Sequence, residues 1–498
     1  MDRDENPDIE QSDASSKIKD IDESNISEEL KESIEEHHEE QAEHGGLLRL
    51  SDEEAYVGDT ITIEGYHLPK NQELELYWQS TEGQWGVIKA NEVIGPQYHP
   101  RTDRIDVLQT DDSGEFKKNW TIPEDYGGAH TIEVRSPDGE TLAEAKISIT
   151  PWFEIADTEV TLGETMSITG YGIGPNFLTN NYQISWDNGM VGFMTGVKNR
   201  GTATARFRAV GPPGKHVVQV WRCYNGVPYL QNNTQSPYGP VAGGRQSIWT
   251  VEVTEPETPP EPSWVDPLPE EDPISIHYPE LDVSTDAKID ITPNHGQPGA
   301  NAVIQGKNFP AEEEVNLVWY RHEGEHVQGI PVSPEPKPDV LPSVMTNEDG
   351  RFSVEVTIPE DVGSTRPITA KVNDQSVAVT GFMMQPSIVN FSPTKGPVGT
   401  EIEIEISGIG WTEYEMAPFV VYDNKFLGYM CGQDLATKRT ILPAAGEPGY
   451  HFIDIYPTMF PDLQTDELDF DTKPHLSYEN NHPVRQLPAL HFAFEITE

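Results

Sequence analysis

The chain has 498 residues, enough for three to five domains of ordinary size. It contains 41 Gly and 42 Pro residues and only 35% hydrophobic residues, a composition that argues against long helices and membrane spans and favours a multi-domain β protein. The net charge of −51 repels phosphate backbones and anionic lipid headgroups, so nucleic acid and direct membrane insertion are not expected. Adaptation to high salt or alkaline pH would produce the same acidity without any functional role.

Residues 1–46 carry 17 acidic side chains against four basic ones and are predicted to form an acidic, disordered tail. The first residues lack the basic and apolar regions of a signal peptide. The two cysteines, Cys223 and Cys431, have neither a CxxC context nor zinc-ligand spacing, and we expect no disulfide framework, metal or cofactor.

The rest of the chain repeats itself around a spacer rich in Pro and acidic residues at 255–286. The pentapeptide Thr-Ile-Pro-Glu-Asp at 121–125 recurs at 357–361, an offset of 236 residues. Trp186-Asp187-Asn188 has its counterpart in Tyr422-Asp423-Asn424 at the same offset. These matches predict a duplicated pair of domains, which we name A (47–149), B (150–254), A′ (287–383) and B′ (384–498).

Each unit begins with a Gly-led turn and a segment of alternating apolar and polar residues, as in 59–65 and 165–170. This period of two indicates strands that bury one face, and further short strands follow between Gly, Pro, Asn and Asp turns. About 100 residues of this pattern predict a β-sandwich. The fold class is therefore all-β: four tandem immunoglobulin-like sandwiches in an A-B-linker-A′-B′ order.

Two stretches resemble the opening of a known family of modules. Ile291-Thr292-Pro293 with the following residues to Phe309, and Phe391-Ser392-Pro393 with the following residues to Gly408, are similar to IPT/TIG immunoglobulin-like domains. The first half keeps only the last glycine of the motif, at Gly58 and Gly163. The resemblance implies a sandwich fold and stalk, adhesive or accessory roles like those of bacterial and archaeal surface proteins, and it implies no catalytic residues.

The sequence offers little for catalysis, and we predict that the protein is not an enzyme. His216 and His451 follow Pro-Gly turns at equivalent positions and are interpreted as half-buried groups bonded to nearby carbonyls. Asp187-Asn188 and Asp423-Asn424 are interpreted as hairpin turns. A calcium site remains an alternative role for three closely spaced carboxylates, Asp466, Asp469 and Asp471.

Two long loops are the candidates for recognition, because hairpin connections normally need two to five residues. The loop of B mixes tyrosines with amides, and the loop of B′ mixes aromatic and acidic residues, compositions that suit rigid aromatic contacts and adaptable hydrogen bonds. The alternative is that each loop covers its own sheet or a neighbouring domain. The candidates are Tyr224, Tyr229, Asn233 and Tyr238 in B, and Phe470 and Tyr478 in B′.

Unit B alone is not acidic, with seven basic and six acidic residues. Either this is a neutral solvated face, or it docks an acidic partner such as a second copy of the chain, head to tail. The residues proposed for such a face are Arg206, Arg208, Lys215 and Arg245.

Together these features predict a non-enzymatic structural or adhesive component of a cell surface, extracellular filament or particle that acts through protein-protein contacts. The alternative is a carbohydrate-binding or enzyme-accessory protein that uses the aromatic loops of the B units, with a glycan as its partner. An extracellular, particle or cell-surface location is expected, although no signal peptide is visible.

Overall fold

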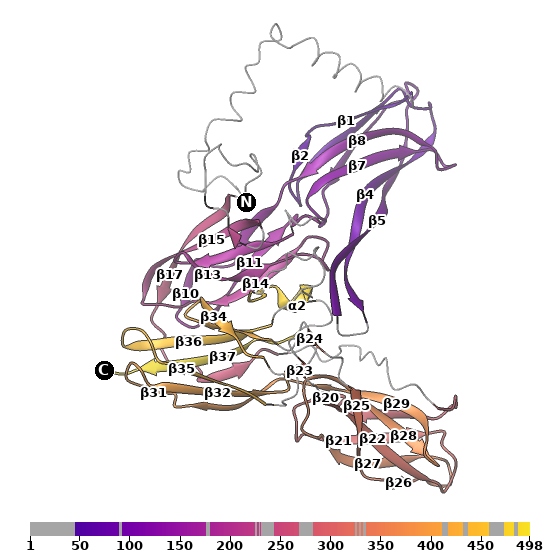
Figure 1. Cartoon of the computed structure of the whole chain (residues 1–498). Helices are drawn as coiled ribbons and strands as arrows, with labels where there is room; N and C mark the ends of the chain where they lie inside the picture. The colour runs from indigo at the N-terminus through magenta and orange to yellow at the C-terminus, as the bar shows by residue number, and fades with distance from the viewer. Residues whose placement is uncertain are drawn as a thin grey trace.

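The computed structural model of the chain describes residues 45–88, 92–175, 180–224, 227–228, 230, 244–267, 282–323, 326–327, 330–331, 335–410, 417–431, 437–457, 473–482 and 487–498. Strands form nearly all of its regular structure, and α2 (Tyr478–Asn481) is the one helix among these residues. The strands build four sandwiches, which confirms the predicted all-β fold of tandem immunoglobulin-like units (Figure 1). No helix in the described ranges has the length and apolar character needed to cross a membrane.

All four units share one topology: a three-stranded sheet faces a larger sheet, and a short early strand runs parallel to the last strand of the larger sheet. In A the sheets have the orders β1-β3-β6 and β2-β8-β7-β4-β5. The strands of A are β1 (Leu47–Leu50), β2 (Glu54–Ala55), β3 (Thr60–Tyr66), β4 (Glu73–Ile88), β5 (Glu92–Gln109), β6 (Phe116–Thr121), β7 (Gly128–Arg135) and β8 (Thr141–Ile149).

Unit B has the sheet orders β14-β11-β9 and β10-β17-β15-β12-β13, with β16 paired to β15. Strand β13 is therefore the edge of the larger sheet and β14 is an edge of the smaller one. The strands of B are β9 (Trp152–Ile155), β10 (Glu159–Thr161), β11 (Thr165–Tyr171), β12 (Tyr182–Trp186), β13 (Gly189–Met194), β14 (Ala203–Arg208), β15 (Gly214–Tyr224), β16 (Val227–Pro228) and β17 (Arg245–Thr254).

Unit A′ has the sheet orders β19-β21-β27 and β20-β29-β28-β22-β25, with β26 paired to β22 and a separate β23-β24 pair. Its strands are β19 (Lys288–Thr292), β20 (His295–Gly296), β21 (Asn301–Lys307), β22 (Glu314–Glu323), β23 (His326–Val327), β24 (Ile330–Pro331), β25 (Glu335–Val340), β26 (Val344–Met345), β27 (Phe352–Thr357), β28 (Ser364–Val372) and β29 (Gln375–Met384).

Unit B′ has the sheet orders β30-β32-β35 and β18-β37-β36-β33-β34, with β31 paired to β37. Strand β18 (Ser263–Val265) lies in the stretch that was predicted to be a spacer, yet it pairs with the last strand of B′. The other strands are β30 (Ser387–Ser392), β31 (Lys395–Gly396), β32 (Glu401–Ser407), β33 (Phe419–Tyr422), β34 (Lys425–Tyr429), β35 (Thr437–Pro443), β36 (Gly449–Tyr456) and β37 (Leu490–Ile496).

The same close contact joins A to B and A′ to B′. A Cβ atom built on Gly127 would lie 2.0 Å from the carbonyl oxygen of Gly172, and one on Gly363 would lie 2.1 Å from that of Gly408. Both pairs are related by the offset of 236 residues, so the repeated element includes the junction between its two sandwiches. No side chain larger than hydrogen fits at either position without moving backbone.

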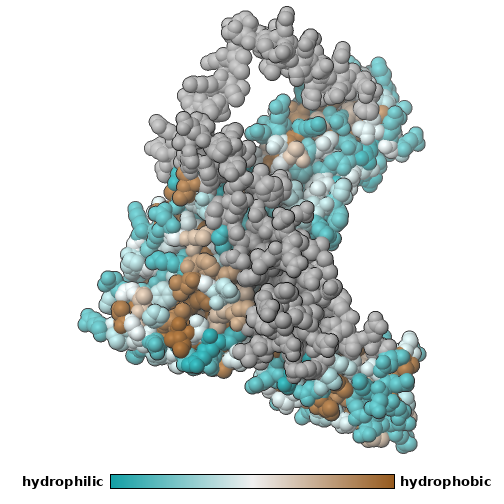
Figure 2. Space-filling model, in the orientation of Figure 1, coloured by the Kyte–Doolittle hydropathy of each residue, from teal (hydrophilic) through white to brown (hydrophobic). Residues whose placement is uncertain are grey.

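Two features bring distant units together. Strands β4 and β5 pair far beyond the part of β4 that β7 covers, and this ribbon reaches from A toward α2 (Figure 1). The larger sheet of B′ is buried on both faces: Ile453 and Ile455 of β36 lie in the core of B′, whereas Phe452 and Tyr456 join the core cluster of B. On the surface seen in Figure 2, hydrophobic residues gather over the B and B′ part, while the visible surfaces of A and A′ are mainly hydrophilic.

Candidate functional site

A segment of B′, residues 473–482, lies on B and is named here the clasp. The Phe193 backbone N–H donates to the Pro474 carbonyl at 2.9 Å, and the Leu476 N–H donates back to the Phe193 carbonyl at 2.8 Å. On its other side, the Leu476 carbonyl accepts from the N–H of Arg206 at 2.9 Å. Phe193 lies on β13 and Arg206 on β14, so the clasp bridges the edges of the two sheets of B.

The side chains of the clasp complete the interior of B. Leu476 and Tyr478 are buried in the core cluster of B. The His475 ring stacks on Phe193 with centroids 4.9 Å apart. The Ser477 hydroxyl accepts from the Thr195 N–H at 3.0 Å and donates to the Thr195 carbonyl at 3.1 Å. A sandwich of B strands alone would leave this side of the core open.

The end of the clasp also meets the ribbon of A. The Trp85 indole N–H of β4 donates to the Asn481 carbonyl at 2.8 Å. The Asn481 side-chain oxygen accepts from the Lys198 N–H of B at 2.9 Å, and Lys198 Nζ donates to the His482 carbonyl at 3.1 Å. The clasp therefore holds A, B and B′ together at one point.

Beside the clasp lies a buried network of charged side chains. Arg208 of β14 has no exposed surface, and its Nη1 donates to Asp454 Oδ1 at 3.3 Å. The same carboxylate accepts from His491 Nδ1 at 2.7 Å, and His491 Nε2 donates to Asp266 Oδ1 at 3.0 Å. The Tyr478 hydroxyl donates to the second oxygen of Asp266 at 2.5 Å. Arg208, His491 and two carboxylates thus meet where B, B′ and the start of the linker join.

Each charge in this network supports the others. Burial alone would lower the pKa of His491, but its hydrogen bonds to Asp266 and Asp454 outweigh burial and raise that pKa above the ordinary histidine value. Burial alone would raise the pKa of Asp266, but the hydrogen bonds from His491, Tyr478 and the Ala489 backbone, together with the charge of His491, outweigh burial and lower that pKa. Both shifts favour the charged pair.

Trp264 of β18 is enclosed by the two cations of the network. Its ring stacks on His491 at 4.7 Å, and the guanidinium carbon of Arg208 lies 4.5 Å from the ring centre. Arg208 also lies 4.2 Å from the centre of the Phe452 ring. An aromatic face attracts a cation strongly where water is excluded, so the linker residue Trp264 is part of the contact between B and B′.

The paired histidines of the two B units have structural partners, as the sequence indicated. His216 Nδ1 lies 2.6 Å from an Asp187 carboxylate oxygen, and Nε2 lies 2.8 Å from the Pro212 carbonyl. His451 makes the equivalent contacts with Asp423 and the Glu447 carbonyl at the same distances. Burial alone would lower the pKa of His451, yet its hydrogen bonds to Asp423 and the Glu447 carbonyl, together with the charge of Asp423, outweigh burial and raise that pKa.

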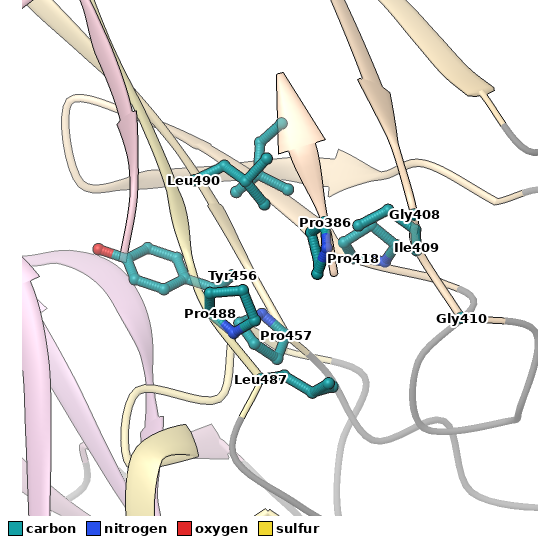
Figure 3. A pocket seen from close by; sticks show the side chains of 11 residues that line it. Pro386, Gly408, Ile409, Gly410, Pro418, Tyr456, Pro457, Leu487, Pro488 and Leu490 are labelled. Atoms are coloured by element: carbon teal, nitrogen blue, oxygen red, sulfur yellow. The ribbon is translucent and has the colours of Figure 1, made fainter. Parts of the chain in front are cut away.

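Two hollows border the B and B′ region. A cavity of about 20 Å³ is lined by four prolines and by aliphatic side chains, and the Tyr456 hydroxyl points away from the prolines (Figure 3). This volume is close to that of one water molecule, so the cavity is too small for a ligand. A groove of about 420 Å³ separates Thr161 to Glu164 of B from the linker residues Pro256 to Glu261, with Arg208 and Trp264 also in its lining.

The structure places the candidate docking residues in two groups. Arg206 pairs with Glu479 of the clasp at 2.8 Å, and Arg208 pairs with Asp454, so both face B′ of the same chain. The interpretation of Arg208 as part of an exposed face is corrected, because a fully buried guanidinium offers nothing to an outside partner. Lys215 on β15 and Arg245 on β17 are exposed.

The loop candidates are also divided. Tyr478 is buried between B and B′ instead of lying in an open recognition loop, which follows the alternative that the loop covers a neighbouring domain. The backbone of Tyr224 ends β15. The remaining candidates lie outside the described residues: Tyr229, Asn233, Tyr238, Phe470, Asp466, Asp469 and Asp471. Within the described ranges, His, Cys, Asp and Glu side chains form no group of three suited to a metal ion.

Sequence reasoning missed Asp266, Trp264, Asp454 and His491. A weak signal was present for the first two, because Ser-Trp-Val interrupts a stretch of prolines and acids and ends directly before Asp266. For the other two the signal was a polar residue within an apolar strand, as in Ile453-Asp454-Ile455. Such a residue marks the second face of a sheet as buried against another unit.

Comparisons with known proteins add little to this description. No protein-family model and no curated protein matches the chain. Salmonella alpha-2-macroglobulin is similar with a TM-score of 0.18 and 9% identity, over 89% of this chain and 30% of that one. The present chain thus spans less than a third of that protein's length.

Two further solved structures show a similar degree of likeness. An ICAM-5 ectodomain fragment has a TM-score of 0.16 and 12% identity over 85% of this chain and 96% of its own. SGBP-B of the Bacteroides ovatus mixed-linkage glucan utilization locus, in complex with a mixed-linkage heptasaccharide, has a TM-score of 0.15 and 12% identity over 62% and 64%. At these values the comparisons carry no argument, and the immunoglobulin-like fold rests on the strand topology.

Proposed function

We propose that the protein is a non-enzymatic structural component of a cell surface, extracellular filament or particle, and that it acts through protein-protein contacts. The observation that carries this proposal is the clasp. Ten residues of B′ serve to complete B and to hold the ribbon of A, and Asp454 and His491 of B′ serve to bind Arg208 and the linker. The clasp and these two buried residues of B′ therefore serve to join units.

The interlocked arrangement suits a part that must keep its shape under load. Separating B from B′ would break backbone hydrogen bonds on two sheet edges and expose Leu476 and Tyr478 of the core. It would also break the ion pair of Arg208 with Asp454, which is buried between the two units. We further infer that the sandwiches are of the IPT/TIG type, on the basis of their opening motifs in A′ and B′.

Electron microscopy of the native source with labelled antibodies tests this function. We expect label on surface layers, filaments or particles, and no turnover when the purified protein is screened against hydrolase substrates. Label confined to the cell interior together with catalytic turnover would contradict the proposal.

A glycan array separates the adhesive proposal from a carbohydrate-binding one, because the loop of B is rich in tyrosine and amide residues. The wild-type protein and a Tyr229→Ala variant are compared on the same array. Binding to a defined glycan that is lost in the variant would support the carbohydrate-binding alternative, whereas a signal at background for both supports protein-protein contacts.

A further inference from the structure

We propose that the acceptor site on B, formed by the edges of β13 and β14, also takes the clasp of a second copy of this chain, so that copies are joined by exchange of their A′-B′ halves. This inference rests on the proposed function and names the partner for its central contact. The partner is a segment of known chemistry, because the same segment is seen in this site within one chain.

The site is built from groups that do not depend on which copy supplies the clasp. The two sides of one contact, the N–H of Thr195 and the hydroxyl of Ser477, are separated by 282 residues of sequence. The backbone bonds at Phe193 and Arg206, and the burial of Leu476 in the core, would form identically with the clasp of a neighbouring copy. No short connection fixes the contact within one chain.

The hinge for such an exchange is short and well defined. Strand β17 of B ends at Thr254, and β18 already pairs with β37 of B′ from Ser263 onward. Only residues 255–262 therefore change direction between the two bodies. Four of these eight residues are proline, at 256, 259, 260 and 262, and proline-rich segments favour an extended course.

The hinge is not packed tightly on B. The groove of about 420 Å³ lies between Pro256 to Glu261 and the turn at Thr161 to Glu164. Straightening the hinge would therefore disturb few contacts on the side of B that faces this groove. A proline-rich hinge with few contacts can take an extended course, which would let identical elements exchange between copies.

A contact of this kind also allows an assembly to grow by the addition of further copies. B contributes two strand edges with Arg206 and Arg208, whereas B′ contributes a sheet face and the clasp. Because the two surfaces differ, each exchanged copy still presents one of each, and the assembly extends head to tail unless it closes into a ring. The intramolecular clasp competes through its high effective concentration, so exchange increases with protein concentration.

Two variants of the full chain, each with one added cysteine, test the exchange, while the buried native Cys223 is left in place. Arg206→Cys and Glu479→Cys are placed on separate copies, since the side chains of this pair meet at 2.8 Å and are partly exposed. Both also carry Cys431→Ser to remove the exposed native thiol. The two variants, with distinguishable mass tags, are mixed at high concentration and treated with a short thiol crosslinker. A covalent pair of differently tagged chains, at a yield that increases with concentration, is the expected result.

Two controls make the outcome decisive. The double variant with both cysteines in one chain must crosslink within the chain when dilute. This result shows that the crosslinker detects the contact between positions 206 and 479. Lys215→Cys mixed with Glu479→Cys measures random collisions, because Lys215 lies exposed on β15, whereas the clasp pairs with β13 and β14. Mixed variants that link no more than this control, while the double variant links within its chain, would overturn the exchange. Surface label in electron microscopy together with that result would retain the proposed function and reject only the exchange.

Discussion

The repeated pentapeptide that reveals the duplication ends on a carboxylate with a structural task. Asp125 is fully buried, and its oxygens accept from the Trp78 indole at 2.7 Å and from Arg101 at 2.8 Å. In A′ the equivalent Asp361 accepts from the Trp319 indole at 3.0 Å. The pentapeptide therefore recurs because its aspartate ties the loop to the core tryptophan of each A unit.

Replacing Asp125 by Ala should destabilise A by about 2–4 kcal/mol, because the variant leaves the Trp78 N–H buried without an acceptor and Arg101 without its inner partner. Chemical unfolding followed by tryptophan fluorescence measures the change. Asp112→Ala, at an exposed turn, is the matched control and should change stability by less than about 0.5 kcal/mol. Equal effects of the two variants would contradict the role of Asp125.

The network at His491 predicts how the contact between B and B′ depends on pH. Its pKa is raised in the folded protein, so its contribution to stability is complete below the unfolded value of about 6.5 and is lost as pH rises through the folded pKa. Asp266 has the opposite effect, because its pKa is lowered in the folded protein. Its contribution to the stability of the fold is complete above about pH 4 and is lost as the pH falls through the folded pKa. Maximal stability is expected between these limits.

A series of unfolding midpoints from pH 5 to pH 9 checks this expectation. The wild type should lose stability toward alkaline pH more steeply than His491→Gln, which cannot titrate. The other titratable groups of this network, Arg208, Asp454, Asp266, Tyr456 and Tyr478, are present in both proteins. Parallel pH profiles for the two proteins would show that His491 does not carry the effect.

The turn residues could be predicted from the sequence, whereas the full length of the longest strands could not. Asp187 and Asn188 have φ values of 48° and 64°, as the hairpin interpretation requires, and Asp423 and Asn424 repeat this geometry. Strand β4 continues beyond Trp78 to Ile88 through residues that lack alternating apolar side chains, so the sequence pattern does not mark this part as a strand. Outside the sandwich a ribbon is held by pairing with its neighbour and not by one buried face, so that signal is absent.

The connection between β36 and β37 shows the same limit in the candidate site. Its aromatic and acidic composition suits recognition, but composition does not tell whether the recognised surface belongs to the same chain. The burial of Tyr478 depends on a sandwich that lies about 280 positions earlier in the sequence. Contacts at such separations leave no local pattern.

Truncation of the clasp should destabilise a unit to which it does not belong in sequence. Leu476→Ala removes a fully buried side chain from the core of B and should cost about 2–5 kcal/mol. Hydrogen exchange should accelerate at the amides of Phe193 and Arg206, which bond to the clasp. Leu427→Ala, on the exposed side of β34, should leave both amides unchanged. Faster exchange confined to B′ would contradict this assignment.

For the molecule as a whole, charge counts do not show which unit the basic residues of B contact. The excess of basic residues in B predicted contact with an acidic unit, and Arg206 and Arg208 do face acidic groups of B′ within the chain. The net charge of a unit predicts the sign of its partner's charge, but not where that partner lies in the sequence. A charge count also includes Arg208 among the surface charges, because it does not distinguish buried from exposed side chains.

A double-mutant cycle on Arg208 and Asp454 tests how the halves of the molecule are held together. Arg208→Met or Asp454→Leu alone should cost about 3–5 kcal/mol, because each leaves a charge without its main partner in a buried site. The double variant should cost much less than the sum. Additive losses in chemical unfolding would indicate that the two side chains act independently.

The place of the clasp in the chain has a consequence for synthesis. The site on B is translated by residue 208, whereas Ser477 follows Thr195 by 282 positions. At roughly 5–20 residues per second, a ribosome needs about 15–55 s to cover that distance. During this interval the nascent B sandwich exposes two strand edges and an open core, so a chaperone, or the finished clasp of a neighbouring chain on the same message, has time to reach it first.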